Sequence, residues 1–287
     1  MASSSGSTNN YHVRSISLPC RSHPAIIRVK EELHKLKTLE TSCCQTSEEI
    51  CNSLSGLADL YDCTNDILGL QFTQEAALID HLLDGSVRLL DICGGTRDLV
   101  SQIKEHTREL DSSIRRRKGD KSIESSIAKF NSFRRQTKKE AKRLTASLKQ
   151  IKKQFEALPM LDLDQKHSSV IGLLTEVGLS SISIYQSLLM FVMVPVSKPK
   201  GRWSVITKMI HAERVSCEEK IENVNELERI DVALISLCTS SNGEKIESAQ
   251  RGLVTLETHF EGMESNLECL FRRLIKTRTL FLNMASH

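Results

Sequence analysis

The chain has 287 residues, of which 39% are hydrophobic and 26% are charged, and its formal net charge is +3. This composition is typical of a soluble protein, and the length suffices for one large domain or two small ones with a real core. Aromatic residues make up only 4%, which argues against a β-sandwich or a β-barrel. Because only 13 glycines and 5 prolines interrupt the chain, we expect few and long elements of the all-α class.

Nine cysteines are scattered along the chain, and no two of them form a Cys-x-x-Cys pair. The first ten residues lack the apolar stretch of a secretory signal, and Ala2 stands where N-myristoylation requires glycine. The cysteine pattern and the missing secretory signal indicate a reducing compartment with free thiols, so we expect a cytoplasmic rather than a secreted protein. The basic run at residues 115–118 could alternatively serve as a nuclear import signal.

Residues 1–22 are rich in serine, threonine and asparagine, and we expect them to form a disordered tail ahead of a single helical-bundle domain at residues 23–287. Within the tail, Arg14, Ser17 and Pro19 form an Arg-Ser-x-Ser-x-Pro pattern. A peptide of this kind, phosphorylated on Ser17, is a docking motif for 14-3-3 proteins, which bind phosphoserine through clustered arginines. The alternative is a chance match in a serine-rich segment.

The first two predicted helices start at Pro24 and near Thr46. In both, apolar residues recur at alternating steps of three and four, which places them on one stripe of a helix. The segment from Thr46 to Glu49 has the composition of a helix start, because a threonine or serine caps free N–H groups and carboxylates suit the positive end of the helix dipole.

The third predicted helix runs from about residue 74 to 117, and the fourth from about 120 to 158, with Pro159 ending it. Gly94 and Gly95 interrupt the third. Two adjacent glycines cost about 2 kcal/mol of helix propensity, so we expect a break or a bend there.

The fifth predicted helix, about residues 168–194, contains an uncharged stretch at residues 178–197. A membrane span needs about 20 mostly apolar residues, whereas four serines and a glutamine dilute the first half of this stretch. We therefore interpret it as a buried central helix of a bundle. A membrane segment remains the alternative, since basic residues follow closely.

The sixth predicted helix covers about residues 203–238, and the last continues to the end of the chain. The last carries a heptad seam of apolar residues from Ile246 to Leu274. Together the segments predict a bundle of long antiparallel helices with coiled-coil-like seams. The last seam could pair within the chain or between two copies, so a homo-oligomer is one alternative.

Positive charge is concentrated in the fourth helix and just before it. Between residues 115 and 153 there are 15 lysines and arginines and three acidic residues. We expect the basic side chains to lie opposite the apolar stripe, as a solvated outer face or as a docking face for an acidic partner or an anionic membrane surface. Nucleic acid is the weaker candidate, because no aromatic residues are interleaved for stacking. The candidate docking face consists of Arg134, Arg135, Lys138, Lys139, Lys142 and Arg143.

No sequence motif for catalysis or nucleotide binding is present. The densest group of metal-ligand residues is Cys43, Cys44 and Cys51, which lacks the second short-spaced pair of a structural zinc site. We expect no enzyme activity, no cofactor and no metal. The alternative is an enzyme of unrecognised type whose site is assembled across helices.

Several segments resemble a plant-specific family of uncharacterised proteins related to BYPASS, and the likeness covers nearly the whole chain. The resembling segments are residues 14–19, 21–24, 57–61, 67–70, 114–117, the basic fourth helix, 270–278 and 282–283. The chain departs from the family pattern at Cys20 and at residues 69–72. The resemblance implies a plant protein with a helical fold, no established enzyme activity and a link to root and shoot development. We therefore expect a scaffold or regulatory protein that acts through protein contacts; a membrane-associated protein using residues 120–158 or 178–197 is the alternative.

Overall fold

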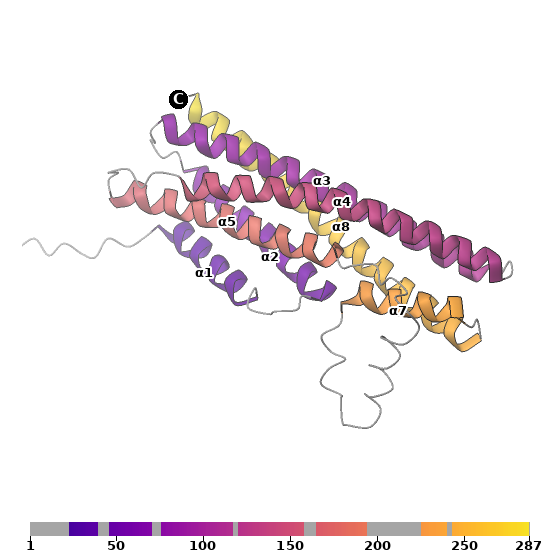
Figure 1. The fold of residues 1–287 in the computed structure, drawn as a ribbon. Coiled ribbons are helices and arrows are strands. Elements are labelled where there is room, and N and C mark those ends of the chain that lie inside the picture. Colours follow the sequence, from indigo (N-terminus) through magenta and orange to yellow (C-terminus); the bar gives the residue numbers. More distant parts are fainter. Residues whose placement is uncertain are drawn as a thin grey trace, which may run out of the picture.

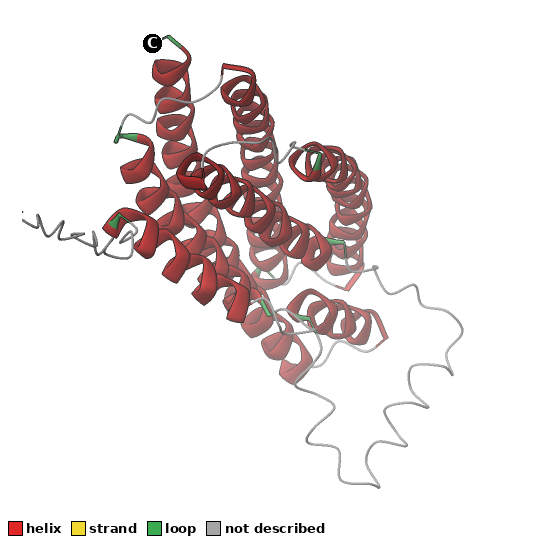
Figure 2. Cartoon of the chain, turned by 90° about the vertical axis from the view of Figure 1, so that its left-hand side faces the viewer, coloured by secondary structure: helices red, strands yellow, loops and turns green. Residues whose placement is uncertain are grey.

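The computed structural model describes residues 23–39, 46–70, 76–116, 120–157, 165–193, 225–239 and 243–286. Every regular element in these residues is an α-helix (Figures 1 and 2). The helices are α1 (Pro24–Leu39), α2 (Ser47–Leu68), α3 (Ala76–Arg115), α4 (Asp120–Glu156), α5 (Gln165–Val192), α7 (Glu226–Thr239) and α8 (Gly243–Ala285). The predicted all-α bundle of long helices is thus confirmed, whereas the predicted tail and residues 203–224 of the sixth predicted helix lie outside the described residues.

The two longest helices, α3 and α8, pack against each other in the most extensive helix pair of the described residues (Figure 1). The whole predicted seam of α8 is buried, and Thr277 and Phe281 extend it. Since this seam packs against α2, α3 and α7, it pairs within the chain. Three ion pairs along one flank show that α3 and α8 are antiparallel. They are Arg97–Glu268, Lys104–Glu264 and Arg108–Glu257.

The predicted break at Gly94 and Gly95 is wrong, because α3 is one continuous helix. A Cβ atom on Gly95 would lie 2.9 Å from Cδ2 of Leu144, so the absence of a side chain allows Leu144 of α4 to pack against the α3 backbone. This close packing offsets the low helix propensity of glycine, which is about 1 kcal/mol per residue. Helix α4, which favours the continuous geometry of α3 through Leu144, is distant from Gly95 in sequence, so the local pattern did not reveal it.

The predicted helix start at Thr46 is confirmed as the N-cap of α2. The Thr46 hydroxyl accepts a hydrogen bond from the Glu49 N–H, and the Glu49 carboxylate accepts one from the Thr46 N–H. This reciprocal capping box satisfies backbone donors that the first turn of a helix leaves free.

Helix α5 packs against α1, α2, α3 and α4, as expected for a central helix. The buried Ser181 hydroxyl of α5 bonds within the bundle: it lies 3.0 Å from the Tyr61 hydroxyl and donates to the Val177 carbonyl. No helix in the described part of the chain has the length and apolar character that crossing a membrane requires.

Candidate docking surface

The buried side of α4 follows a strict seam with alternating steps of three and four residues. It runs through Phe130, Arg134, Thr137 and Ala141, among others. Arg134 therefore does not belong to the basic docking face, and the prediction is wrong at this residue. Its side chain is only 4% exposed and forms an ion pair with Asp231 of α7. A buried arginine needs such a counter-ion, because an unpaired charge away from water is very costly.

Helix α7 is held in place by this ion pair and by apolar packing. Leu227, Ile230, Leu234 and Leu237 are buried, and Ile230 fits over Gly252 of α8, where a Cβ atom would lie 2.6 Å from its Cδ1. Arg134 thus stabilises the contact between α4 and α7.

The remaining basic residues of the predicted face lie on the outer side of α4. Arg143 is exposed and pairs with Glu140 of the same helix, and Lys138 is half-buried. Five other exposed cations, which we call the basic row, occupy the positions farthest from the buried seam. The basic row consists of Arg135, Lys139, Lys142, Lys149 and Lys153.

The basic row has no ion-pair partner among the described residues. Its members follow one another at steps of three, four or seven residues, so they lie on one side of the helix. From Arg135 to Lys153 the row extends over about 27 Å, at 1.5 Å per residue. The structure therefore leaves a straight line of uncompensated positive charge facing solvent.

A line of acidic residues on α3 was not recognised in the sequence. Four exposed carboxylates recur at intervals of seven residues and form what we call the acidic row: Asp84, Asp91, Asp98 and Glu105. Asp84 and Asp98 pair only with arginines of their own helix, Arg88 and Arg97. The strict seven-residue spacing is the signal that could have revealed it.

The acidic and basic rows lie on the same outer face of the bundle, because α3 and α4 run side by side in opposite directions (Figure 1). The ion pair between Glu109 and Lys129, whose side chains are both exposed, marks the outer edge of the contact between the two helices. On each helix the row is displaced from that edge around the helix axis. Each row therefore faces away from the buried seam of its own helix.

The two rows also cover the same stretch of the bundle. Residues of α3 and α4 that meet have numbers adding up to between 238 and 240, as in Gly85 with Phe155, Gly95 with Leu144, His106 with Phe133 and Glu109 with Lys129. By this register, residues 84–105 of α3 lie level with about residues 134–155 of α4. The α3/α4 face thus carries two antiparallel lines of opposite charge, side by side and similar in length.

The remaining candidates from the sequence do not form a site in the described residues. Arg14, Ser17 and Pro19 lie outside the described residues, as do Cys43 and Cys44. Within the described ranges no three histidine, cysteine or acidic side chains are placed to hold a metal ion. Thr96, next to the paired glycines, is fully buried in the middle of α3.

One polar cluster has the residue types of a catalytic triad but not its order. The Ser47 hydroxyl donates to Oε1 of Glu226 at 2.8 Å and lies 2.5 Å from Nδ1 of His259. In a hydrolase the histidine stands between serine and carboxylate, whereas here the serine stands in the middle. Since Ser47 is also fully buried, the cluster serves to join α2, α7 and α8.

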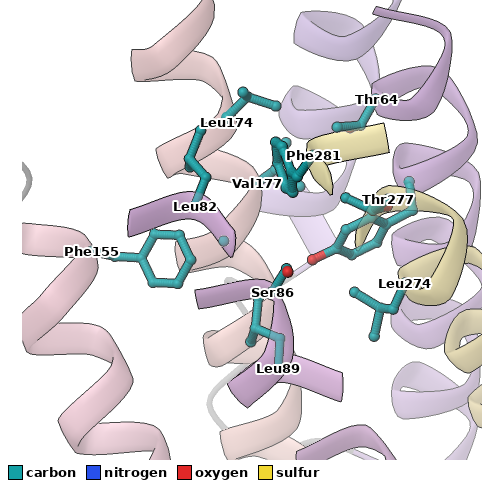
Figure 3. Close-up of a pocket in the computed structure, with 12 residues that line it drawn as sticks. Thr64, Leu82, Ser86, Leu89, Phe155, Leu174, Val177, Leu274, Thr277 and Phe281 are labelled. Carbon is teal, nitrogen blue, oxygen red and sulfur yellow. The ribbon is translucent and has the colours of Figure 1, made fainter. Parts of the chain in front are cut away.

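A small hollow lies among α2, α3, α4, α5 and α8, with Phe155 and Phe281 in its wall (Figure 3). It encloses about 30 Å³, which is room for one or two water molecules and far less than a benzene-sized ligand needs. Its lining is mostly apolar, and burial raises the pKa of the Tyr61 hydroxyl in its wall. We interpret the hollow as a packing defect of the core.

The fold and its charged face define a long-helix bundle whose clearest candidate site is a surface rather than a pocket. A family model described as Protein BPS1 matches residues 53–284, so the chain belongs to the BPS1 family. The comparison with curated proteins and the comparison with solved structures return no match.

Proposed function

We propose that this chain is a non-enzymatic helical scaffold that binds a protein partner through the outer face of α3 and α4. The observation that carries the proposal is the basic row, whose five cations face solvent without acidic partners among the described residues. Aligned charges of this kind steer association and fix the orientation of a partner. The developmental part of the proposal, a role in root and shoot development, rests on membership of the BPS1 family.

The neighbouring acidic row favours a protein over a membrane or a nucleic acid as the partner. Anionic lipid and nucleic acid are both uniformly negative, so Asp91 and its equivalents beside the basic row would repel them. Moreover, none of the large apolar side chains that are exposed in the described residues lies on α4, so the basic row has no apolar anchor beside it for a bilayer. A protein surface, in contrast, can present both signs of charge.

Phosphorylation of Ser17 would add a second contact, to a 14-3-3 protein, and thereby regulate the scaffold. The Arg-Ser-x-Ser-x-Pro pattern of the tail supports this part of the proposal. Its test is the affinity of a Ser17-phosphorylated tail peptide for a 14-3-3 protein. Affinity equal to that of the unmodified peptide would remove it.

Site-specific photo-crosslinking in plant cells tests the docking surface. A crosslinking residue replaces Ala146, which is exposed in the middle of the basic row, and in a matched chain it replaces Ser55, exposed on α2. We expect crosslinks from position 146 to peptides rich in aspartate and glutamate. The substitutions Lys142→Glu and Lys149→Glu should abolish these crosslinks while leaving helix content unchanged.

Two results would contradict the proposal. One is a yield of protein crosslinks at position 146 no higher than that at position 55. The other is binding of the purified chain to phosphatidylserine vesicles that Lys142→Glu and Lys149→Glu abolish, since this would identify α4 as a membrane-binding face.

A further inference from the structure

The acidic and basic rows together make the α3/α4 face complementary in charge to a second copy of itself. A rotation of 180° about an axis parallel to the helices keeps each residue at its own height along the bundle and exchanges left with right. Two copies of the α3/α4 face related by this rotation would place each basic row against the acidic row of the other copy. A two-fold axis is the commonest symmetry of homo-oligomers, and it requires a self-complementary surface of this kind.

The register of α3 against α4 makes the match specific. Facing residues of α3 and α4 have numbers that add up to between 238 and 240. Each member of the acidic row therefore lies within about two residues of the level of a cation in the basic row. After the rotation, the residues at equal height are Asp84 and Lys153, Asp91 and Lys149, Asp98 and Lys142, and Glu105 and Arg135. Every residue of the acidic row in one copy would therefore meet a residue of the basic row in the other copy.

We propose that the α3/α4 face is a homodimer interface, in which two parallel copies join through these four pairs of charges on each side of the two-fold axis. The inference rests on the proposed function and names the partner of its docking surface: a second copy of this chain. The α8 seam is not available for contact between copies, because its residues are buried within the chain.

The size of the face determines what kind of dimer it forms. Rows of about 30 Å on two neighbouring helices about 10 Å apart give a face of about 600 Å² per copy, or about 1,200 Å² in the dimer. This area is at the lower end of specific interfaces. Because the contact is mostly between exposed charges, salt screens it strongly, so the dimer is reversible and dissociates as ionic strength rises.

Sedimentation of the full chain tests the proposal through charge reversal. One variant carries Lys142→Glu and Lys149→Glu, so these two positions of the basic row would face Asp98 and Asp91 of the other copy with like charge. The other carries Asp91→Lys and Asp98→Lys, so these two positions of the acidic row would face Lys149 and Lys142 of the other copy with like charge. In 50 mM salt we expect the original chain to dimerise and the dissociation constant of each variant to rise at least about tenfold, because like charges face each other at an interface.

A chain with all four substitutions separates charge complementarity from damage to the fold. At the four substituted positions the charges have exchanged signs and are again complementary between the two copies, so we expect the dimer to return and to keep its sensitivity to salt. A matched control, Lys30→Glu with Lys276→Glu, removes two exposed lysines of α1 and α8 and should leave the dissociation constant within about twofold of the original value.

Two outcomes overturn the inference: a chain that stays monomeric at 50 mM salt and high concentration, or a four-substitution chain that remains as weak as the two-substitution variants. The crosslinking at position 146 then decides the fate of the proposed function. If it still captures acidic peptides of another protein, only the homodimer is wrong. If it captures no protein, the docking surface is wrong as well.

Discussion

Arg134 and Asp231 are charged residues whose side chains are almost completely buried. Their side chains are 4% and 2% exposed, and they join α4 to α7. Placing two charges in a core is expensive, and their mutual attraction roughly compensates for it. Removing one partner leaves the other charged and buried, which is worse than removing both.

We expect Asp231→Ala to lower the free energy of unfolding by about 3–5 kcal/mol, because it removes the carboxylate that pairs with the buried Arg134 guanidinium. Urea titration followed by circular dichroism measures this loss. The paired replacement Arg134→Met with Asp231→Leu should recover most of it. A cost below about 1 kcal/mol for Asp231→Ala would mean that the guanidinium reaches water.

Phe155 lies between two glycines of different helices. A Cβ atom on Gly178 or on Gly85 would lie closer to its ring than real Cβ contacts do, so the ring packs directly against both helix backbones. We expect Gly178→Ala to destabilise the protein by about 1–3 kcal/mol through overpacking. Gly172→Ala on the same helix, which meets nothing within 4 Å, should instead stabilise it by about 0.5–1 kcal/mol.

Thermal unfolding of the two alanine variants provides the comparison. If both variants lower the melting temperature equally, Phe155 is not held where the structure places it. Rescue of Gly178→Ala by Phe155→Leu would show that the clash is with the ring.

Burial raises the pKa of the Cys93 thiol to about 11, from an ordinary value of 9.0. The folded chain therefore keeps its proton at a pH at which the unfolded chain has lost it. It follows that the free energy of unfolding falls as pH rises from about 9 towards 11, by up to about 1.4 kcal/mol per pH unit. Chemical unfolding at pH 8, 9 and 10 measures the slope, and Cys93→Ala should reduce it between pH 9 and 10. An equal slope in both chains would show that other groups cause it.

At the scale of helices, apolar periodicity and capping predicted most elements, because both depend on residues close together in sequence. The seam of α8 and the N-cap of α2 are examples. The wrong predictions concern residues whose partners are distant: Gly95 depends on Leu144, and Arg134 on Asp231. Arg134 nevertheless carried a local signal, since it is four residues after Phe130 and three before Thr137 on the buried seam.

The capping box of α2 gives a prediction at this scale. Thr46→Ala removes the acceptor of the Glu49 N–H and should lower the free energy of unfolding by about 1 kcal/mol. Thr46→Ser keeps the hydroxyl and should cost much less. Equal losses in the two variants, measured by urea titration, would assign the effect to the threonine methyl group instead.

For the whole molecule, the sequence indicated half of the candidate surface. Clustered lysines and arginines predicted a basic face, whereas the acidic residues of α3 are diluted by intervening residues over a much longer segment. Their relation to the basic row depends on the register between α3 and α4, which no local pattern specifies. Only the assembled bundle shows two rows of opposite charge at equal height.

The most direct test of the α3/α4 face is native mass spectrometry of a mixture of the two charge-reversal variants. In each variant alone the two substituted positions would face like charges of the other copy, so each should be monomeric alone. Mixed in equal amounts, they should form a heterodimer of one chain of each kind, with homodimers nearly absent. A mixture that stays monomeric, or that shows the two homodimers and the heterodimer in statistical proportion, would contradict the account.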